Sequence, residues 1–125
     1  MKTVAMIPAR LGSKRVHNKN LRLIGGKPLI AYIVESVVNS GAFDEIYINS
    51  ESDIFESIAN DYGVKFYKRP NSLSSDSATN DDFVLDFIEN INCDIIFQFL
   101  PTSPFVTSSD IREFYDMMMD SDHDT

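Results

Sequence analysis

Short apolar runs alternate along the chain with longer segments in which apolar residues recur at the helical period. Four of the runs are predicted to be buried β-strands, and they occupy residues 3–7, 45–49, 64–68 and 94–100. Four segments place apolar side chains on one face of a helix, and they begin at Pro28, near Ser52, near Phe83, and at Ser109 or Asp110. Gly41 and Gly63 directly follow the first two of these segments and are expected to end the helices.

This alternation of strands and helices predicts an α/β fold. Successive β-α-β units form a parallel sheet with right-handed crossovers and with helices on both faces, a Rossmann-like three-layer sandwich. Residues 9–27 are polar, basic and contain glycine, and we predict one long loop there. Another strand would follow the last predicted helix in such a fold. We therefore expect residues 1–125 to be part of one domain whose remainder lies downstream.

The composition narrows the class of protein. With 43% hydrophobic and 24% charged residues, it is that of an ordinary globular domain rather than a disordered chain. The apolar runs are far shorter than the ~20 residues that a membrane span needs. A single cysteine, Cys93, permits no disulfide within the chain, and two histidines leave no Cys/His zinc set. These features predict a cytoplasmic protein.

The charges are divided unevenly along the chain. Residues 1–34 contain no acidic residue and carry a formal charge of +7, whereas residues 35–125 carry −15, which leaves −8 overall. A net negative charge argues against a protein that coats nucleic acid or an anionic membrane. The basic opening segment instead predicts an anion site near the start of the chain.

All the basic residues of this segment except Lys2 fall in the predicted loop after the first strand, where open α/β sheets bind ligands. Gly12 allows a close approach of the backbone to a ligand, and Arg and Lys side chains suit phosphate oxygens. The loop matches neither the P-loop nor the GxGxxG pattern, which disfavours a nicotinamide dehydrogenase. A solvated basic surface is the alternative interpretation, but the position after the first strand favours phosphate binding.

Several motifs occur in a fixed order along nearly the whole chain. They are Ile7-Pro-Ala-Arg-Leu-Gly-Ser-Lys-Arg, Lys19-Asn20, Gly26-Lys27-Pro28-Leu29-Ile30, Arg69-Pro70, Ser75-Asp-Ser-Ala-Thr and Leu100-Pro-Thr-Ser-Pro. Together they resemble the acylneuraminate cytidylyltransferase family, the CMP-sialic acid synthetases. The resemblance implies a sheet of the nucleotide-diphospho-sugar transferase type, and it makes residues 1–125 the nucleotide-binding part of a single cytidylyltransferase domain.

The family's reaction, by resemblance, transfers CMP from CTP to the anomeric hydroxyl of a sialic-acid-type nonulosonic acid and releases pyrophosphate. A magnesium ion would balance the phosphate charge, with its ligands expected downstream of this chain. The full-length protein would be a homodimer, and activity of the 125-residue chain alone is expected to be weak or absent.

The family resemblance also implies site residues, each assigned at the position of this chain that matches the family motif. Arg10 and Lys19 would hold the triphosphate as the catalytic groups. The residues implied to shape this CTP-binding loop beside them are Ala9, Leu11, Gly12, Ser13, Lys14 and Asn20. Three others, Arg69, Ala78 and Asn80, would lie at the cytosine and the ribose.

Two departures from the family pattern fall where relatives meet the sugar. Leu100 stands where many relatives have Gln, and Phe105-Val106 stands where they often have Leu-Arg. The acceptor therefore stays open between a sialic acid and a related sugar such as pseudaminic or legionaminic acid. A non-catalytic nucleotide-binding or assembly module is a further alternative.

Overall fold

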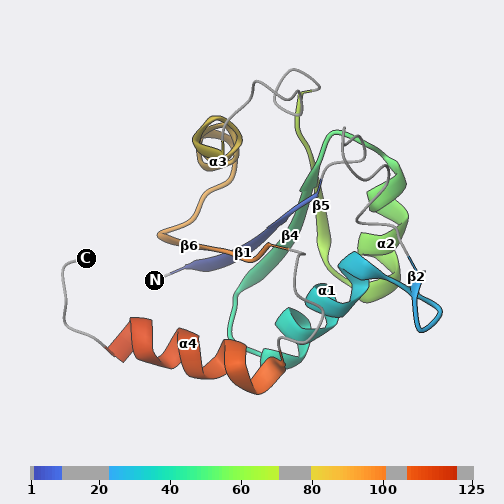
Figure 1. Cartoon of the computed structure of the whole chain (residues 1–125). Helices are drawn as coiled ribbons and strands as arrows, with labels where there is room; N and C mark the ends of the chain where they lie inside the picture. The colour runs from blue at the N-terminus through green and yellow to red at the C-terminus, as the bar shows by residue number, and fades with distance from the viewer. Residues whose placement is uncertain (1, 10–22, 71–79, 101–106, 121–125) are drawn as a thin grey trace.

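A parallel sheet of four strands forms the centre of the molecule, in the order β5-β4-β1-β6 (Figure 1). The computed structural model describes residues 2–9, 23–70, 80–100 and 107–120. The strands are β1 (Thr3–Pro8), β4 (Glu45–Ser50), β5 (Lys65–Lys68) and β6 (Ile95–Gln98). They confirm the four runs predicted from the sequence and the parallel sheet.

The strand β1 is central because it pairs with β4 on one side and with β6 on the other. All six of its residues are buried. A strand that is covered by helices on both faces of the sheet needs apolar side chains on both faces. This explains why the apolar residues of β1 form a continuous run and do not alternate with polar ones.

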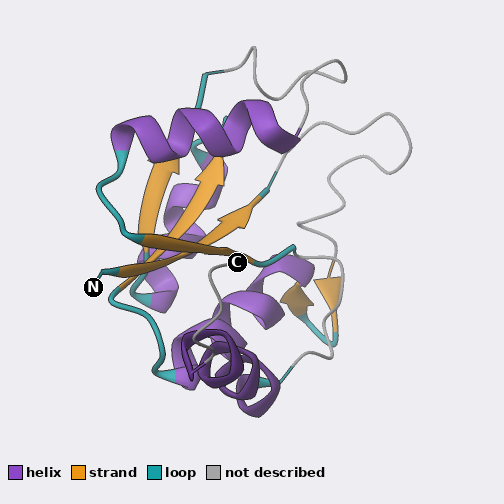
Figure 2. Cartoon of the chain, turned by 90° about the vertical axis from the view of Figure 1, so that its left-hand side faces the viewer, coloured by secondary structure: helices purple, strands orange, loops and turns teal. Residues whose placement is uncertain are grey.

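Four helices cover the two faces of the sheet, and they are α1 (Leu29–Ser40), α2 (Ile54–Tyr62), α3 (Asn80–Asn90) and α4 (Ser108–Asp120). Side chains of α1, α2 and α4 pack with Ile7 and Ile48 in one core, whereas Phe87 of α3 packs with Met6 and Tyr47 in the other. Figure 2 shows α3 and α4 on opposite sides of the sheet. The predicted three-layer sandwich is therefore confirmed.

The helix ends follow from local chemistry. Gly41 and Gly63 end α1 and α2 with φ angles of 64° and 71°, the left-handed conformation that glycine adopts without steric cost. At the start of α4, the N–H of Asp110 donates to Thr107 Oγ1 and the N–H of Thr107 donates to Asp110 Oδ2, at 3.1 and 3.2 Å. No helix in the described ranges is long and apolar enough to cross a membrane.

One part of the sequence prediction is wrong. The segment expected to be loop up to residue 27 contains an antiparallel hairpin, formed by β2 (Leu23–Ile24) and β3 (Lys27–Pro28). Gly25 and Gly26, with φ of 62° and 82°, form its turn. Pro28 lies in β3 with ψ of 143° and precedes α1, instead of being its first helical residue.

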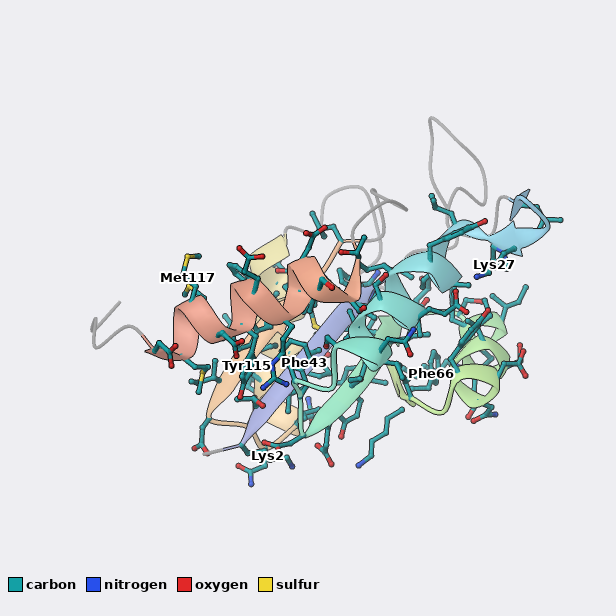
Figure 3. All side chains as sticks on the ribbon, turned by 90° about the horizontal axis from the view of Figure 1, so that it is seen from below. Lys2, Lys27, Phe43, Phe66, Tyr115 and Met117 are labelled. Atoms are coloured by element: carbon teal, nitrogen blue, oxygen red, sulfur yellow. The ribbon has the colours of Figure 1, made fainter. Side chains whose placement is uncertain are left out.

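The hairpin is attached to the first helix through Lys27. Its ammonium group forms an ion pair with Glu35 and lies 4.7 Å from the centre of the Tyr32 ring, both residues of α1. The hydrogen bond to Glu35 is the main reason why the pKa of Lys27 is raised. Figure 3 shows Lys27 on the hairpin and far from Lys2, so these two basic residues lie in different parts of the molecule.

Candidate functional site

The sheet reverses its direction of growth at β1, since β4 and β5 lie on one side of it and β6 on the other. In open parallel sheets, ligands bind at such a switch point, beyond the carboxyl ends of the strands. We call this end of the sheet the carboxyl edge, and its described residues are Ala9, Asn49, Ser50, Arg69 and Phe99.

Backbone hydrogen bonds continue past the strands at the carboxyl edge. The N–H of Ala9 donates to the carbonyl of Asn49 at 2.9 Å, and that of Arg69 donates to the carbonyl of Ser50 at 2.9 Å. The N–H of Phe99 reaches the carbonyl of Met6 at 3.0 Å. The chain thus leaves β1 from a fixed point, because Ala9 is hydrogen-bonded to the neighbouring strand and buried.

Arg69 joins two strands that are not neighbours. It follows β5, yet its Nη2 donates to the carbonyl oxygen of Ala9, which follows β1, at 3.2 Å. Because β4 lies between β5 and β1, the side chain spans the end of β4. Arg69 is only 3% exposed, so this guanidinium is a buried cation at the carboxyl edge.

Asn49 is the polar residue at this edge that the sequence analysis did not single out. It is fully buried, and its Nδ2 donates to the Met6 sulfur at 3.3 Å. Its Oδ1 accepts no hydrogen bond from any residue within the described ranges. Buried polar atoms rarely lack a partner, which makes Asn49 a candidate functional residue. The signal in the sequence is an amide side chain at the end of an apolar strand.

Charges at the opposite end of the sheet, the amino edge, are paired with one another. Glu45 forms ion pairs with Lys65 and with Lys2, whose Nζ lies 3.0 Å away. The hydrogen bonds from Lys65 and then from Lys2 lower the pKa of Glu45 to about 2. The N–H of Thr3 also donates to Asp44 at 2.8 Å. These contacts hold the first residues of β1, β4 and β5 together.

Cys93 and the acidic residues offer little further chemistry in the described ranges. Cys93 is half-buried just before β6, away from the carboxyl edge, and burial raises the pKa of its thiol. A raised pKa leaves less of the reactive thiolate. Among residues 2–9, 23–70, 80–100 and 107–120, no three His, Cys, Asp or Glu side chains are grouped to hold a metal ion.

The structure brings together two of the predicted site residues, Ala9 and Arg69, through their hydrogen bond. Asn80 is the first residue of α3. Leu100 follows β6 and is more than half exposed. The other predicted residues, namely Arg10, Leu11, Gly12, Ser13, Lys14, Lys19, Asn20 and Ala78, lie outside the described ranges.

Comparison with known proteins gives a consistent match. A family model described as cytidylyltransferase matches residues 4–125. The N-acylneuraminate cytidylyltransferase of Escherichia coli O18:K1:H7 is 37% identical, over 90% of this chain and 27% of that protein. The pseudaminic acid cytidylyltransferase of Campylobacter jejuni serotype O:23/36 is 36% identical, over 93% of this chain and 53% of that protein. The chain thus spans about a quarter to a half of the length of these relatives.

A solved structure resembles the fold closely. It is a CMP:2-keto-3-deoxy-manno-octonic acid synthetase in complex with CTP, and it superposes with a TM-score of 0.82 at 25% identity. The superposition covers 97% of this chain and 48% of that one.

Proposed function

This chain belongs to the cytidylyltransferase family, and we propose that residues 1–125 carry the nucleotide-binding part of an enzyme that transfers CMP from CTP to a nonulosonic acid. The observation that carries the proposal is the family match over residues 4–125. The fold supports it, because the basic segment of the sequence begins directly after Ala9, at the switch point of the sheet.

The reaction is a displacement at phosphorus. The anomeric hydroxyl oxygen of the sugar bonds to the α-phosphorus of CTP, and the bond from that phosphorus to the bridging oxygen breaks. Pyrophosphate leaves, and the hydroxyl proton is released. Catalysis of phosphoryl transfer depends mainly on positioning and on stabilising charge, so cationic side chains are its main requirement. In our proposal, Arg10 and Lys19 provide these cations around the triphosphate.

The cytidine would lie along the carboxyl edge beside the triphosphate. Ala78 and Asn80 are proposed to meet the base and the ribose, in accordance with the family resemblance. Asn80 begins α3, which follows β5 in the chain and therefore starts near the carboxyl edge. Arg69 is buried at the same edge, and by the same resemblance it is proposed to meet the base or the ribose together with them.

A magnesium ion is part of the proposal, although the described residues provide no three-ligand site. Magnesium at nucleotide sites is commonly held by one or two carboxylates together with the phosphates of the substrate, where it neutralises their charge. No step is assigned to particular ligands of the ion. Treatment with EDTA should abolish turnover, and added Mg²⁺ should restore it.

Two measurements test the proposal separately. Calorimetric titration with CTP, UTP, GTP and ATP tests the nucleotide site, and we expect CTP to bind most tightly. Incubation with CTP, Mg²⁺ and a nonulosonic acid, followed by mass spectrometry, tests transfer. Equal affinity for all four nucleotides would contradict the assignment as a cytidylyltransferase.

The similarity to a pseudaminic acid cytidylyltransferase, at 36% identity, favours a second acceptor besides a sialic acid. The transfer assay should therefore compare N-acetylneuraminic, pseudaminic and legionaminic acids at equal concentration. The acceptor that gives the largest kcat/KM identifies the substrate class. CTP binding without any CMP-sugar product would instead favour a nucleotide-binding module.

A further inference from the structure

The helix α3 lies by itself on its face of the sheet, within the part of the chain that the structure describes. Side chains of α1, α2 and α4 fill the core on the other face, and Figure 2 shows α3 opposite to α4. Phe87 is the one described side chain of α3 that is fully buried. Its ring packs edge-to-face on Tyr47 and Tyr67, with ring centres 5.3 and 5.2 Å apart. Apolar burial is not directional, so this ring holds the helix against the sheet without fixing its rotation.

A polar contact beside Phe87 supplies the missing direction. The hydroxyl group of Tyr67 in β5 donates to Oδ2 of Asp86 in α3 at 2.7 Å. Both side chains are half-buried, and a hydrogen bond to a carboxylate is stronger than one between neutral groups. Burial, and then the bond to Asp86, raise the pKa of Tyr67 to about 12, so the hydroxyl keeps its proton near neutral pH. The contact is therefore a directed link from the sheet to the helix.

This link connects the carboxyl edge with the start of α3. Tyr67 pairs with Asn49 in the sheet register and is one residue before the end of β5. Asn80, the first residue of α3, precedes Asp86 by six residues, or about 9 Å along a helix that rises about 1.5 Å per residue. Backbone hydrogen bonds keep a helix stiff over this length. A helix that is held at Asp86 and Phe87 therefore also has its first turn held.

We propose that Tyr67 is a positioning residue for the nucleoside: through Asp86 it sets where the first turn of α3 lies at the carboxyl edge. The inference rests on the proposed CTP site, in which Asn80 meets the base or the ribose. It deepens that proposal, because it assigns the placement of the cytidine half of CTP to a contact between β5 and α3. The triphosphate half, which is assigned to Arg10 and Lys19, does not depend on this contact.

The test separates the nucleoside from the phosphates. CTP and inorganic tripolyphosphate are titrated calorimetrically into the wild type and into variants of the two linked residues. Tyr67→Phe keeps the ring that packs on Phe87 but has no donor. It should bind CTP about fivefold more weakly than the wild type, as expected for the loss of one hydrogen bond, and should bind tripolyphosphate with unchanged affinity.

Variants of the acceptor distinguish the hydrogen bond from the charge. Asp86→Leu removes the acceptor and should weaken CTP binding as Tyr67→Phe does. Asp86→Asn removes the same charge but keeps an acceptor oxygen, so it should bind CTP like the wild type. The double variant Tyr67→Phe/Asp86→Leu should lose no more affinity than either single variant, because the two groups act through one contact.

The matched control is Tyr47→Phe. Tyr47 packs on the same Phe87 ring, but its hydroxyl donates to Glu45 of its own strand at 3.3 Å and not to α3. The control thus removes one hydroxyl group from the same aromatic cluster without cutting the link to the helix. Its affinity for CTP should equal that of the wild type.

Equal losses of affinity for CTP and for tripolyphosphate in Tyr67→Phe, or no loss for either, would overturn the inference. A ligand-free measurement checks the same contact: the backbone amide shifts of Asn80 and Asp81 should move in Tyr67→Phe and stay in place in Tyr47→Phe. Unchanged shifts in Tyr67→Phe contradict the proposal whether or not a nucleotide binds. Failure of the proposed function is recognised separately, since the wild type would then show no preference for CTP over other nucleotides.

Discussion

The two edges of the same sheet use buried and charged groups in different ways. At the amino edge, Glu45 is held between Lys2 and Lys65, and Asp44 accepts a backbone N–H. At the carboxyl edge, the buried Arg69 donates to a neutral carbonyl, and the buried Asn49 has an oxygen that no described residue satisfies. Opposite charges that are paired with each other stabilise a fold. A buried acceptor that no described residue satisfies, such as Asn49 Oδ1, is instead a group that a ligand can use.

The largest effect should come from removing the cations of the proposed triphosphate site. Arg10→Ala and Lys19→Ala should each cost about 2–4 kcal/mol of transition-state stabilisation, because each removes a charged donor from the reacting phosphates. Pyrophosphate release from CTP measures this loss as kcat/KM. Lys2→Ala, at the amino edge, is the control with unchanged turnover. Wild-type rates in both loop variants would show that the phosphates bind elsewhere.

A smaller effect is expected at Asn49, where a substitution should stabilise the fold slightly instead of reducing activity. Asn49→Leu replaces a buried amide by an apolar side chain of similar size, and it removes an acceptor that has no partner among the described residues. The free energy of unfolding should stay equal or rise by about 1 kcal/mol, because an unsatisfied buried acceptor costs free energy. Denaturation in urea measures the change. Asn49→Asp is the matched control and should destabilise the protein. A clear loss of stability in Asn49→Leu would mean that the amide is structural.

At the amino edge, the effect depends on pH. The pKa of Glu45 is lowered to about 2 in the folded protein from its ordinary value of 4.5. A lowered pKa gives stability that is present above pH 4.5 and lost as the pH falls toward 2. Glu45→Gln should therefore lower the free energy of unfolding at pH 6 by about 1 kcal/mol or less, since solvent screens the pair. The two proteins should become equally stable only below pH 2, where Glu45 is protonated in both the folded and the unfolded state, and a difference that persists there would contradict the mechanism.

The smallest effect should be at the exposed pair of Lys68 and Asp53. Both side chains are more than half exposed. Such pairs contribute about 0–1 kcal/mol, so Lys68→Ala should change the free energy of unfolding by about 0.5 kcal/mol at most. Thermal unfolding at low and high salt measures this contribution. A larger loss of stability would mean that Lys68 supports the carboxyl edge. The difference between charges paired at the surface and charges at the proposed site would then be smaller.

The helices and strands were predictable wherever the signal is local. Gly41 and Gly63 end their helices as expected, because glycine has no Cβ and can adopt positive φ without steric cost. The continuous apolar run of β1 likewise predicted a strand buried on both faces. The hairpin at residues 23–28 was missed, since strands of two residues are too short to show an alternating pattern.

The site was predictable in its residue types but not in its contacts. Ala9 and Arg69 were both candidates, yet they are 60 residues apart in the sequence. No local sequence pattern indicates that the Arg69 side chain donates a hydrogen bond to the Ala9 carbonyl. Their contact depends on the order of the strands in the sheet, which brings the end of β5 across β4 to β1. Asn49 was missed because burial and hydrogen bonding, which distinguish it from a surface amide, follow only from the packed structure.

The chain is held in place on both sides of residues 10–22, and this affects the entropy cost of closing the loop between the two points. Ala9 is fixed by β4 and by Arg69 before this segment, and Lys27 attaches the following hairpin to α1. The cost of closing a loop grows only with the logarithm of its length once its ends are held. The entropy cost of closing the chain between Ala9 and the hairpin is therefore already contained in the folding of the domain. Insertions between these two points should add little to that cost, so the length of the connection can change without redesign of the sheet.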